Sequence, residues 1–334
     1  MLDAPILVLV DLETTETEPA PTGPSLELLT AARGLTGGDV IALALQPLGE
    51  PARAALAGAG ATRLLTADLG ESAHLPATAA DAVVAAVSTV APAAVLVVSD
   101  YRGKELAGRA AVMLDSACVS DATALEAGSA GDDSVLCASK LVLSGSWSTT
   151  ASVGSAGSAP IIAVRPGIAE VSAADGAPLT AEPLEVPVSA EAAAVRLVSR
   201  EATSVASGPA LTEARTVVVG GRGVDGDFDL VRSLAEPLGA AVGATRVACD
   251  EGWAPRGEQI GQTGLSVSPN LYVGLGVSGA VHHTVGMQSS AHIVAVCDDP
   301  DAPIFELADF GVVGDVAEVV PQALDEIRRA RSAQ

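Results

Sequence analysis

Short apolar runs alternate with longer segments of Ala and Leu periodicity through the first 115 residues. The apolar runs have the length and the Val, Leu and Ile content of buried strands, at residues 6–10, 40–45, 63–66 and 94–99. The segments between and after them have helical periodicity, at residues 25–35, 51–57, 78–91 and 103–115. This alternation is typical of βαβ units around a mainly parallel sheet.

The pattern changes in the next part of the chain. Residues 134–143 (S-V-L-C-A-S-K-L-V-L) and 194–201 (A-V-R-L-V-S-R-E) predict antiparallel strands that close the sheet. The polar segment 199–213, which contains Gly-Pro, predicts a domain boundary. Because 334 residues exceed one average domain, we expect two domains, at 1–205 and 206–334.

The second part begins a new α/β unit with T-V-V-V-G-G-R-G. The pattern predicts a helix at 227–236 and strands at 216–220, 240–245, 271–273 and 292–299. Near the C-terminus, Asp315 and Glu318 resemble a capping pair, while Pro321 predicts that the last helix starts late or kinks. The fold class predicted for the whole chain is α/β, with two doubly wound, Rossmann-like domains.

Composition narrows the classes of partner. Aromatic residues make up only 2% of the chain, so stacking of nucleic-acid bases is disfavoured and the core must consist of Ala, Val and Leu. The formal net charge of -23 repels phosphate backbones and anionic lipid surfaces. We therefore expect partners among proteins and small molecules, with no nucleic acid.

Cysteine usage and hydropathy indicate a cytoplasmic protein. The four cysteines form no C-x-x-C pair, which argues against a metal ribbon, an iron–sulfur cluster or a disulfide framework. The N-terminus lacks a basic stretch, so it resembles a first strand and not a signal peptide. No apolar run has the length of a membrane span, so we expect no direct membrane insertion.

Three glycine-rich loops in the second unit indicate a dinucleotide. G-L-G-V-S-G at 274–279 fits G-x-G-x-x-G after a predicted strand and before a predicted helix, and Asp298 and Asp299 stand where a ribose-binding acid is expected. G-G-R-G at 220–223 places Arg222 where it can pair with a phosphate. Q-I-G-Q-T-G at 259–264 fits either a third such loop or an ordinary surface loop. The loops alone do not say which dinucleotide binds.

Two adjacent histidines, His282 and His283, follow the second glycine-rich loop. Neighbouring residues on a helix point about 100° apart, and no ligand set at zinc spacing surrounds the pair, so we predict no metal site. An acid–base pair, or two residues that face different groups, both remain open.

Four stretches of the second unit resemble the FAD-binding domain of the electron-transfer flavoprotein alpha subunit: G-A-T-R-V-A-C-D-E-G-W, Q-I-G-Q-T-G, L-Y-V-G-L-G-V-S-G-A-V-H-H and D-P-D-A-P-I-F-E-L-A-D-F-G-V-V-G-D. The resemblance extends from about residue 216 to residue 327. The first domain is similar more loosely, through I-L-V-L-V, L-L-T-A-A-R-G-L and V-S-D-A-T-A-L. The resemblance implies that the domain at 1–205 is a nucleotide-binding-like α/β domain and that the domain at 206–334 binds FAD.

The resemblance implies an electron carrier of fatty acid beta-oxidation, with no catalytic residues. In that family a heterodimer of alpha and beta subunits holds FAD mainly on the alpha C-terminal domain. It accepts electrons from dehydrogenases, typically acyl-CoA dehydrogenases, and passes them to a membrane quinone oxidoreductase. Alternatives are the alpha subunit of an electron-bifurcating flavoprotein, an NAD-dependent dehydrogenase, and a subunit that has lost its cofactor.

The same resemblance implies which residues contact the cofactor. His283 matches a histidine that hydrogen-bonds the flavin pyrimidine oxygen, Arg246 matches an arginine over the flavin ring, and Asp315 and Val316 match contacts near the adenosine end. His282 departs from the usual Gln, and Cys297 departs from the usual Asn. The implied cofactor-binding set is Arg222, Thr245, Arg246, Gln259, Ile260, Gly261, Gln262, Thr263, Ser278, Gly279, Ala280, Val281, His282, His283, Cys297, Asp315 and Val316.

Overall fold

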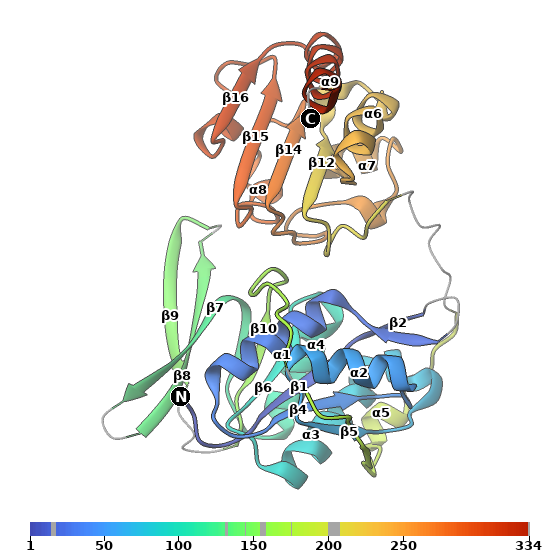
Figure 1. Ribbon diagram of the computed structural model, residues 1–334, viewed down its shortest axis with the longest axis vertical. Coiled ribbons are helices and arrows are strands. Elements are labelled where there is room, and N and C mark those ends of the chain that lie inside the picture. Colours follow the sequence, from blue (N-terminus) through green and yellow to red (C-terminus); the bar gives the residue numbers. More distant parts are fainter. Residues whose placement is uncertain are drawn as a thin grey trace. The chain divides into compact units, whose positions relative to one another are not determined.

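The computed structural model describes residues 1–14, 18–130, 133–143, 145–153, 158–174, 176–199 and 208–332. The chain divides into two compact units, Met1–Arg200 and Glu201–Gln334 (Figure 1). The boundary that the sequence predicts, between residues 205 and 206, lies outside the described residues.

Within its described residues, unit 1 is built on a nine-stranded sheet with the strand order β11-β5-β4-β1-β6-β10-β7-β8-β9. All neighbouring strands from β11 to β7 pair in parallel, whereas β7, β8 and β9 pair antiparallel. The strands are β1 (Ile6–Val10), β4 (Val40–Ala44), β5 (Arg63–Thr66), β6 (Ala94–Val98), β7 (Cys118–Ala130), β8 (Asp133–Val142), β9 (Trp147–Val153), β10 (Ile161–Val164) and β11 (Ala181–Pro183), with a separate pair β2 (Leu12–Thr14) and β3 (Pro19–Pro21).

Helices cover both faces of this sheet, because its central strands are apolar on both sides. In β1, Ile6 and Val8 pack in the core that contains Leu28 of α1, while Leu7 packs in the core that contains Val83 of α3. The helical elements of unit 1 are α1 (Gly23–Leu35), α2 (Glu50–Ala59), η1 (Gly70–His74), α3 (Pro76–Val90), α4 (Tyr101–Met113) and α5 (Ala190–Ala193).

Most elements predicted for unit 1 are confirmed, but one is wrong. The four parallel strands and the four helices lie within three residues of their predicted bounds, and the strand at 134–143 is β8. The strand predicted at 194–201 is absent from residues 194–199, the part of it that the structure describes. Ser189 caps α5 by accepting from Ala192 N, and Val195 and Val198 beyond it are exposed. The alternating apolar residues of 194–199 therefore have no sheet to pack against.

In its described residues, unit 2 forms a five-stranded parallel sheet with the order β13-β12-β14-β15-β16. Its strands are β12 (Thr216–Gly220), β13 (Ala241–Ala244), β14 (Leu271–Leu275), β15 (His292–Cys297) and β16 (Phe310–Val313). Its helical elements are η2 (Arg222–Val224), α6 (Phe228–Leu238), α7 (Arg246–Asp250), η3 (Arg256–Glu258), α8 (Val281–Thr284), η4 (Pro303–Glu306) and α9 (Val316–Ser332).

The two faces of this second sheet are covered differently. One face packs on α6 and α9 through residues such as Val218 and Val231. The other face packs on loops, through Tyr272 and Ile260 among others. Loops with functional side chains are thus held against a rigid parallel sheet.

The final helix begins directly after Asp315, the first residue of the predicted capping pair. It starts at Val316 and continues past Pro321, so of the two alternatives predicted for Pro321 the late start is wrong. The side chain of Asp315 explains the start, because its Oδ1 accepts a hydrogen bond of 2.8 Å from the backbone N–H of Ala317.

In the described part of the chain, no helix is long and apolar enough to cross a bilayer.

Candidate functional site

A cavity of about 630 Å³ opens at the carboxyl ends of the strands of unit 2. Four strands contribute to it through the residues that follow them: Arg222 after β12, Thr245 after β13, Ser278 after β14 and Asp298 after β15. Crevices at this edge of a parallel sheet are the usual ligand sites of α/β folds, and this volume suits a cofactor.

The cavity brings together most of the predicted site. It is lined by Arg222, Thr245, Arg246, Gln259, Ile260, Gly261, Gln262, Thr263, Ser278, Gly279, Ala280, His282, His283 and Cys297 from the predicted set. The remaining wall consists of Gly223, Val247, Gly276, Val277, Asp298 and Asp299. Val247 and Val277 carry no chemical signal of their own in the sequence, and only their position beside predicted residues points to them.

Three predicted residues do not line this cavity. Asp315 caps α9, and Val316 is 3% exposed in the core that α9 forms with α6. Val281 is 53% exposed and begins α8. A role for these three toward a cofactor stays a prediction.

The glycines of two loops allow the strand ends to approach each other. Gly223 N donates to Gly276 O over 3.0 Å, and a Cβ on Gly223 would lie 2.7 Å from the Gly276 Cα. Gly276 also has a φ of +61°, which L side chains rarely adopt. These glycines therefore serve loop packing as well as access to the cavity.

The G-x-G-x-x-G stretch is followed by a helix, as the sequence predicts, but this helix is short. Its first glycine, Gly274, lies inside β14, and the helix that follows is the single turn α8. The chain turns away soon afterwards, where a Cβ on Gly286 would lie 2.5 Å from the backbone N of Gly261. This close backbone contact explains why the helix stops. A helix of a single turn is too short for its N-terminus to support the binding of a pyrophosphate.

The loop at 259–264 is a structured wall of the cavity and not an ordinary surface loop. Gln259 and Ile260 are 3% and 1% exposed, and Gln259 Nε2 donates to Thr263 Oγ1 over 3.0 Å. The backbone N–H of Gln262 donates to His282 O over 2.7 Å, which joins the loop to α8. Gly261 has a φ of +143°, and a Cβ on it would lie 2.5 Å from the same carbonyl oxygen. Only glycine fits there.

The two histidines face different groups. His283 is 6% exposed, and its Nδ1 and Nε2 lie 3.0 Å from Ile260 O and 2.7 Å from the Tyr272 hydroxyl. Desolvation by burial lowers the pKa of His283 to about 4, although the bond to Ile260 opposes the change. His282 is exposed, and its Nδ1 lies 2.6 Å from Gln262 Oε1. The predicted hydrogen bond from His283 to a flavin stays a prediction, since both of its ring nitrogens already have protein partners.

The described residues contain no group of three or more His, Cys, Asp or Glu side chains that could hold a metal ion.

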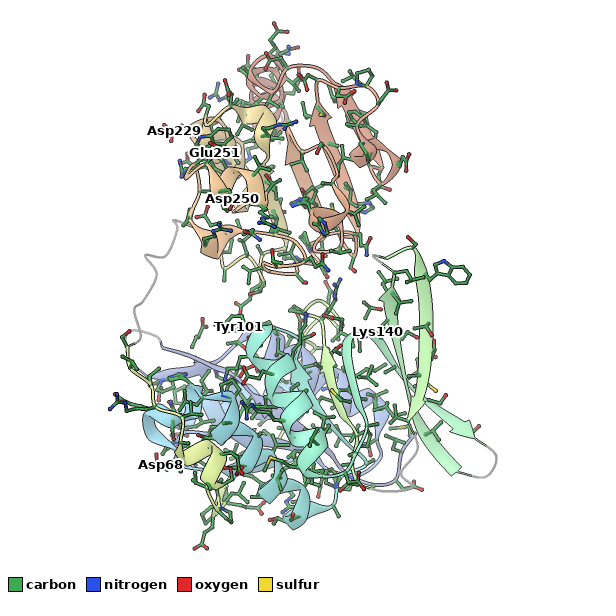
Figure 2. All side chains as sticks on the ribbon, turned by 180° about the vertical axis from the view of Figure 1, so that it is seen from behind. Asp68, Tyr101, Lys140, Asp229, Asp250 and Glu251 are labelled. Carbon is green, nitrogen blue, oxygen red and sulfur yellow. The ribbon has the colours of Figure 1, made fainter. Side chains whose placement is uncertain are left out.

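Arg246 forms an ion pair at the cavity rim. Its Nε lies 3.3 Å from Asp250 Oδ2, and Asp250 Oδ1 lies 2.5 Å from Arg256 Nη2. The Arg246 side chain is 65% exposed, so the pair itself stabilises the fold little. Asp250, labelled in Figure 2, is thus held by two guanidinium groups, and Arg246 keeps much of its positive charge available at the cavity.

The cavity wall holds a buried hydroxyl group that needs a partner. Among the described residues, Thr245 Oγ1 is buried without a hydrogen bond. A buried polar atom without a partner costs about 1–3 kcal/mol, and such atoms often mark a ligand contact. The Thr245 hydroxyl, the Arg222 charge and the Asp298 carboxylate fit a ligand that combines polar ring edges, phosphate and ribose.

Comparison with known proteins gives two family matches. Residues 210–288 match the Electron transfer flavoprotein FAD-binding domain, and residues 12–194 match the Electron transfer flavoprotein domain. The chain is 41% identical over 328 residues to "Electron transfer flavoprotein subunit alpha" of Mycobacterium leprae (strain TN), covering 97% of this chain and 98% of that protein. It is 41% identical over 329 residues to the protein of the same name from Mycobacterium tuberculosis (strain ATCC 25618 / H37Rv), with the same coverage. A shorter match, 53% over 116 residues, links it to the Paracoccus denitrificans protein of that name, covering 34% of this chain and 38% of that protein.

Proposed function

Because the chain belongs to the electron transfer flavoproteins and is similar to their alpha subunits over nearly its whole length, we propose that it forms a heterodimer with a beta subunit and carries electrons on an FAD held in the cavity of unit 2. The observation that carries the proposal is the cavity itself, at the carboxyl edge of the sheet in the part of the chain that matches the FAD-binding domain.

The side chains of the wall suit the parts of FAD. The Arg222 guanidinium suits the pyrophosphate, and Asp298 and Asp299 suit ribose hydroxyls. The Thr245 hydroxyl and the loop at 259–263 supply polar groups for the edge of the flavin ring. When bound, FAD supplies the redox chemistry, accepting and releasing electrons.

The protein residues then orient the cofactor and tune its electrostatics. Arg246 contributes a positive charge at the rim, which favours an added electron on the ligand. An electron carrier makes and breaks no bonds of a substrate. In this function the side chains of the cavity wall need only to hold and orient the cofactor.

We further propose acyl-CoA dehydrogenases as electron donors and a membrane quinone oxidoreductase as the acceptor. The resemblance of the motifs to the family supports these partners. The net charge of -23 favours partners with basic docking surfaces.

The test uses the chain co-purified with an electron transfer flavoprotein beta subunit from the same organism. Catalytic amounts of an acyl-CoA dehydrogenase and its acyl-CoA substrate should bleach the flavin absorbance of the heterodimer. A flavin band that stays unbleached would contradict the proposed donor, and reduction by NADH alone would favour a different electron source.

A further inference from the structure

A buried chain of hydrogen bonds runs from the interior of the sheet of unit 2 to the cavity wall. Tyr272, the second residue of β14, is 0% exposed, and its hydroxyl oxygen lies 2.7 Å from His283 Nε2. The Nδ1 of the same imidazole lies 3.0 Å from Ile260 O. His283 and Ile260 line the cavity, whereas Tyr272 does not.

The chemistry of these three groups determines the hydrogen positions. A backbone carbonyl can only accept, so the proton of the neutral imidazole is on Nδ1 and is donated to Ile260 O. His283 Nε2 then carries a lone pair, which accepts the Tyr272 O–H. Burial lowers the pKa of His283 to about 4 and also raises the pKa of the Tyr272 hydroxyl, so both groups stay neutral near pH 7.

The carbonyl at the end of this chain begins the loop that forms one wall of the cavity. Ile260 is tied to the sheet through its N–H, which donates to Ala244 O over 2.9 Å, and to His283 through its carbonyl. Two residues further on, Gln262 bonds to α8 through its N–H and its side chain. The orientation of the His283 ring therefore affects where the loop lies against a ligand.

We propose that Tyr272 is a positioning residue of the cofactor site, which keeps His283 neutral by donating to its Nε2 lone pair and through it fixes the Ile260 carbonyl. The proposal rests on the proposed function, because the ligand whose properties it changes is FAD. Tyr272 acts through His283 and does not touch the cavity.

A tyrosine that only filled the core would affect stability but not the proton state of a cavity residue. Tyr272→Phe keeps the ring and removes the hydroxyl, which leaves the His283 lone pair without a donor. That lone pair can then take a proton more readily, so the pKa of His283 should rise. Reduction of the flavin, which adds negative charge beside it, should then become coupled to proton uptake.

The experiment compares wild type, Tyr272→Phe and Tyr272→Phe/His283→Gln as holo-heterodimers. The first reduction potential is measured between pH 5.5 and 8. Tyr272→Phe should show a new dependence on pH that the double variant lacks, and FAD should bind up to about tenfold more weakly, the effect of one unsatisfied buried group. The other charged or titratable side chains of the wall are unchanged in these variants: Arg222, Arg246, His282, Cys297, Asp298 and Asp299.

The matched control is Tyr101→Phe. Tyr101 is the other tyrosine of the chain, lies at the start of α4 in unit 1 and is 85% exposed (Figure 2). This control should leave the potential and its pH profile as in wild type.

A second measurement does not need FAD. Nitrogen-15 NMR of the histidine rings should show wild-type His283 neutral with its proton on Nδ1, and Tyr272→Phe should raise the pH at which His283 takes up a second proton. A wild-type His283 protonated on Nε2, or a Tyr272→Phe protein in which His283 titrates as in wild type and the potential keeps the wild-type pH profile, would overturn the proposal. A wild-type heterodimer without flavin would instead overturn the proposed function. The NMR measurement would still test the tautomer of His283.

Discussion

Arg246 and Asp250 set the charge at the cavity rim, and the first prediction concerns that charge. Arg246→Ala should lower the first reduction potential, because a positive charge near the flavin favours the added electron. We expect a fall on the order of 50 mV, since about 59 mV corresponds to 1.4 kcal/mol for one electron and the 65% exposure of Arg246 weakens the interaction. Arg246→Lys should recover part of the loss.

A potentiometric titration of the holo-heterodimer measures this change. Arg232→Ala is the control, since Arg232 pairs with Asp229 outside the cavity. Equal potentials in wild type and Arg246→Ala would show that Arg246 does not act on the cofactor.

Cys297 places a thiol, a weak hydrogen-bond donor, on the cavity wall. It is 5% exposed, lines the cavity and has its Sγ 3.8 Å from Asp298 Oδ1. Cys297→Asn should tighten FAD binding by about 0.5–1.5 kcal/mol, the net value of one hydrogen bond. Calorimetric titration of the apo-heterodimer with FAD gives the dissociation constant. Cys249→Ser, away from the cavity, should leave that constant unchanged, and no gain in Cys297→Asn would mean that position 297 makes no contact with the nucleotide.

His283 also makes stability depend on pH. Its pKa falls from 6.5 in the unfolded chain to about 4 in the folded protein because of burial. The unfolded state thus binds the extra proton first, so the stabilisation is complete above pH 6.5 and is lost as the pH falls toward 4, by on the order of 3 kcal/mol. Urea unfolding at several pH values should show a smaller loss between pH 6.5 and 4 in His283→Gln. Parallel curves for the two proteins would refute a neutral, buried His283.

At the scale of elements, the loop at 259–264 depends on one backbone conformation. Gly261 has a φ of +143° and packs against the His282 carbonyl. Gly261→Ala should destabilise unit 2 by at least about 1 kcal/mol, because an L side chain is strained there and has no space. Gly257→Ala is the matched control, since Gly257 has open space around it.

The measurement is thermal unfolding followed by circular dichroism, together with the FAD dissociation constant. Gly261→Ala should unfold at a lower temperature and bind FAD more weakly, whereas Gly257→Ala should do neither. An unaffected Gly261→Ala protein would show that the loop tolerates another conformation.

Helices and strands follow from the local pattern of apolar and polar residues, and most of the confirmed predictions concern such elements. β1 is a continuous apolar run, as a strand buried on both faces requires. Its neighbouring residues Ile6 and Leu7 lie on opposite faces, and both faces are covered by helices. The length of α8 could not be predicted, because it depends on the contact between Gly286 and Gly261 from a distant loop. The alternation at 194–199 likewise predicts a strand only if a sheet edge is available.

The candidate site could likewise be predicted only where its features are local in the sequence. Its glycine-rich loops and their adjacent polar residues are visible in the sequence as motifs. The partners of His283 are not, because Tyr272 and Ile260 are brought to it by the register of β14 and by the loop at 259–264. The unsatisfied Thr245 hydroxyl is also a property of the packed structure.

At the scale of the whole molecule, unit 1 is a sheet with helices on both faces, and unit 2 presents the cavity at the edge of its own sheet. In unit 1 an ion pair joins Asp11, directly after β1, to Arg102 of α4, the helix that follows β6. The strand order reverses between β1 and β6, and ligand sites of doubly wound sheets usually lie at such a point, which this ion pair occupies.

The central claim is that FAD occupies the cavity of unit 2, and the flavin content of the purified heterodimer tests it most directly. Wild type should carry about one FAD for each alpha chain, visible in the absorption spectrum. Ser278→Trp, which fills the cavity from an exposed wall position, should remove the flavin, while Asp229→Trp on the outer surface of α6 should retain it. A colourless wild-type heterodimer, or a Ser278→Trp heterodimer with full flavin content, would contradict the claim.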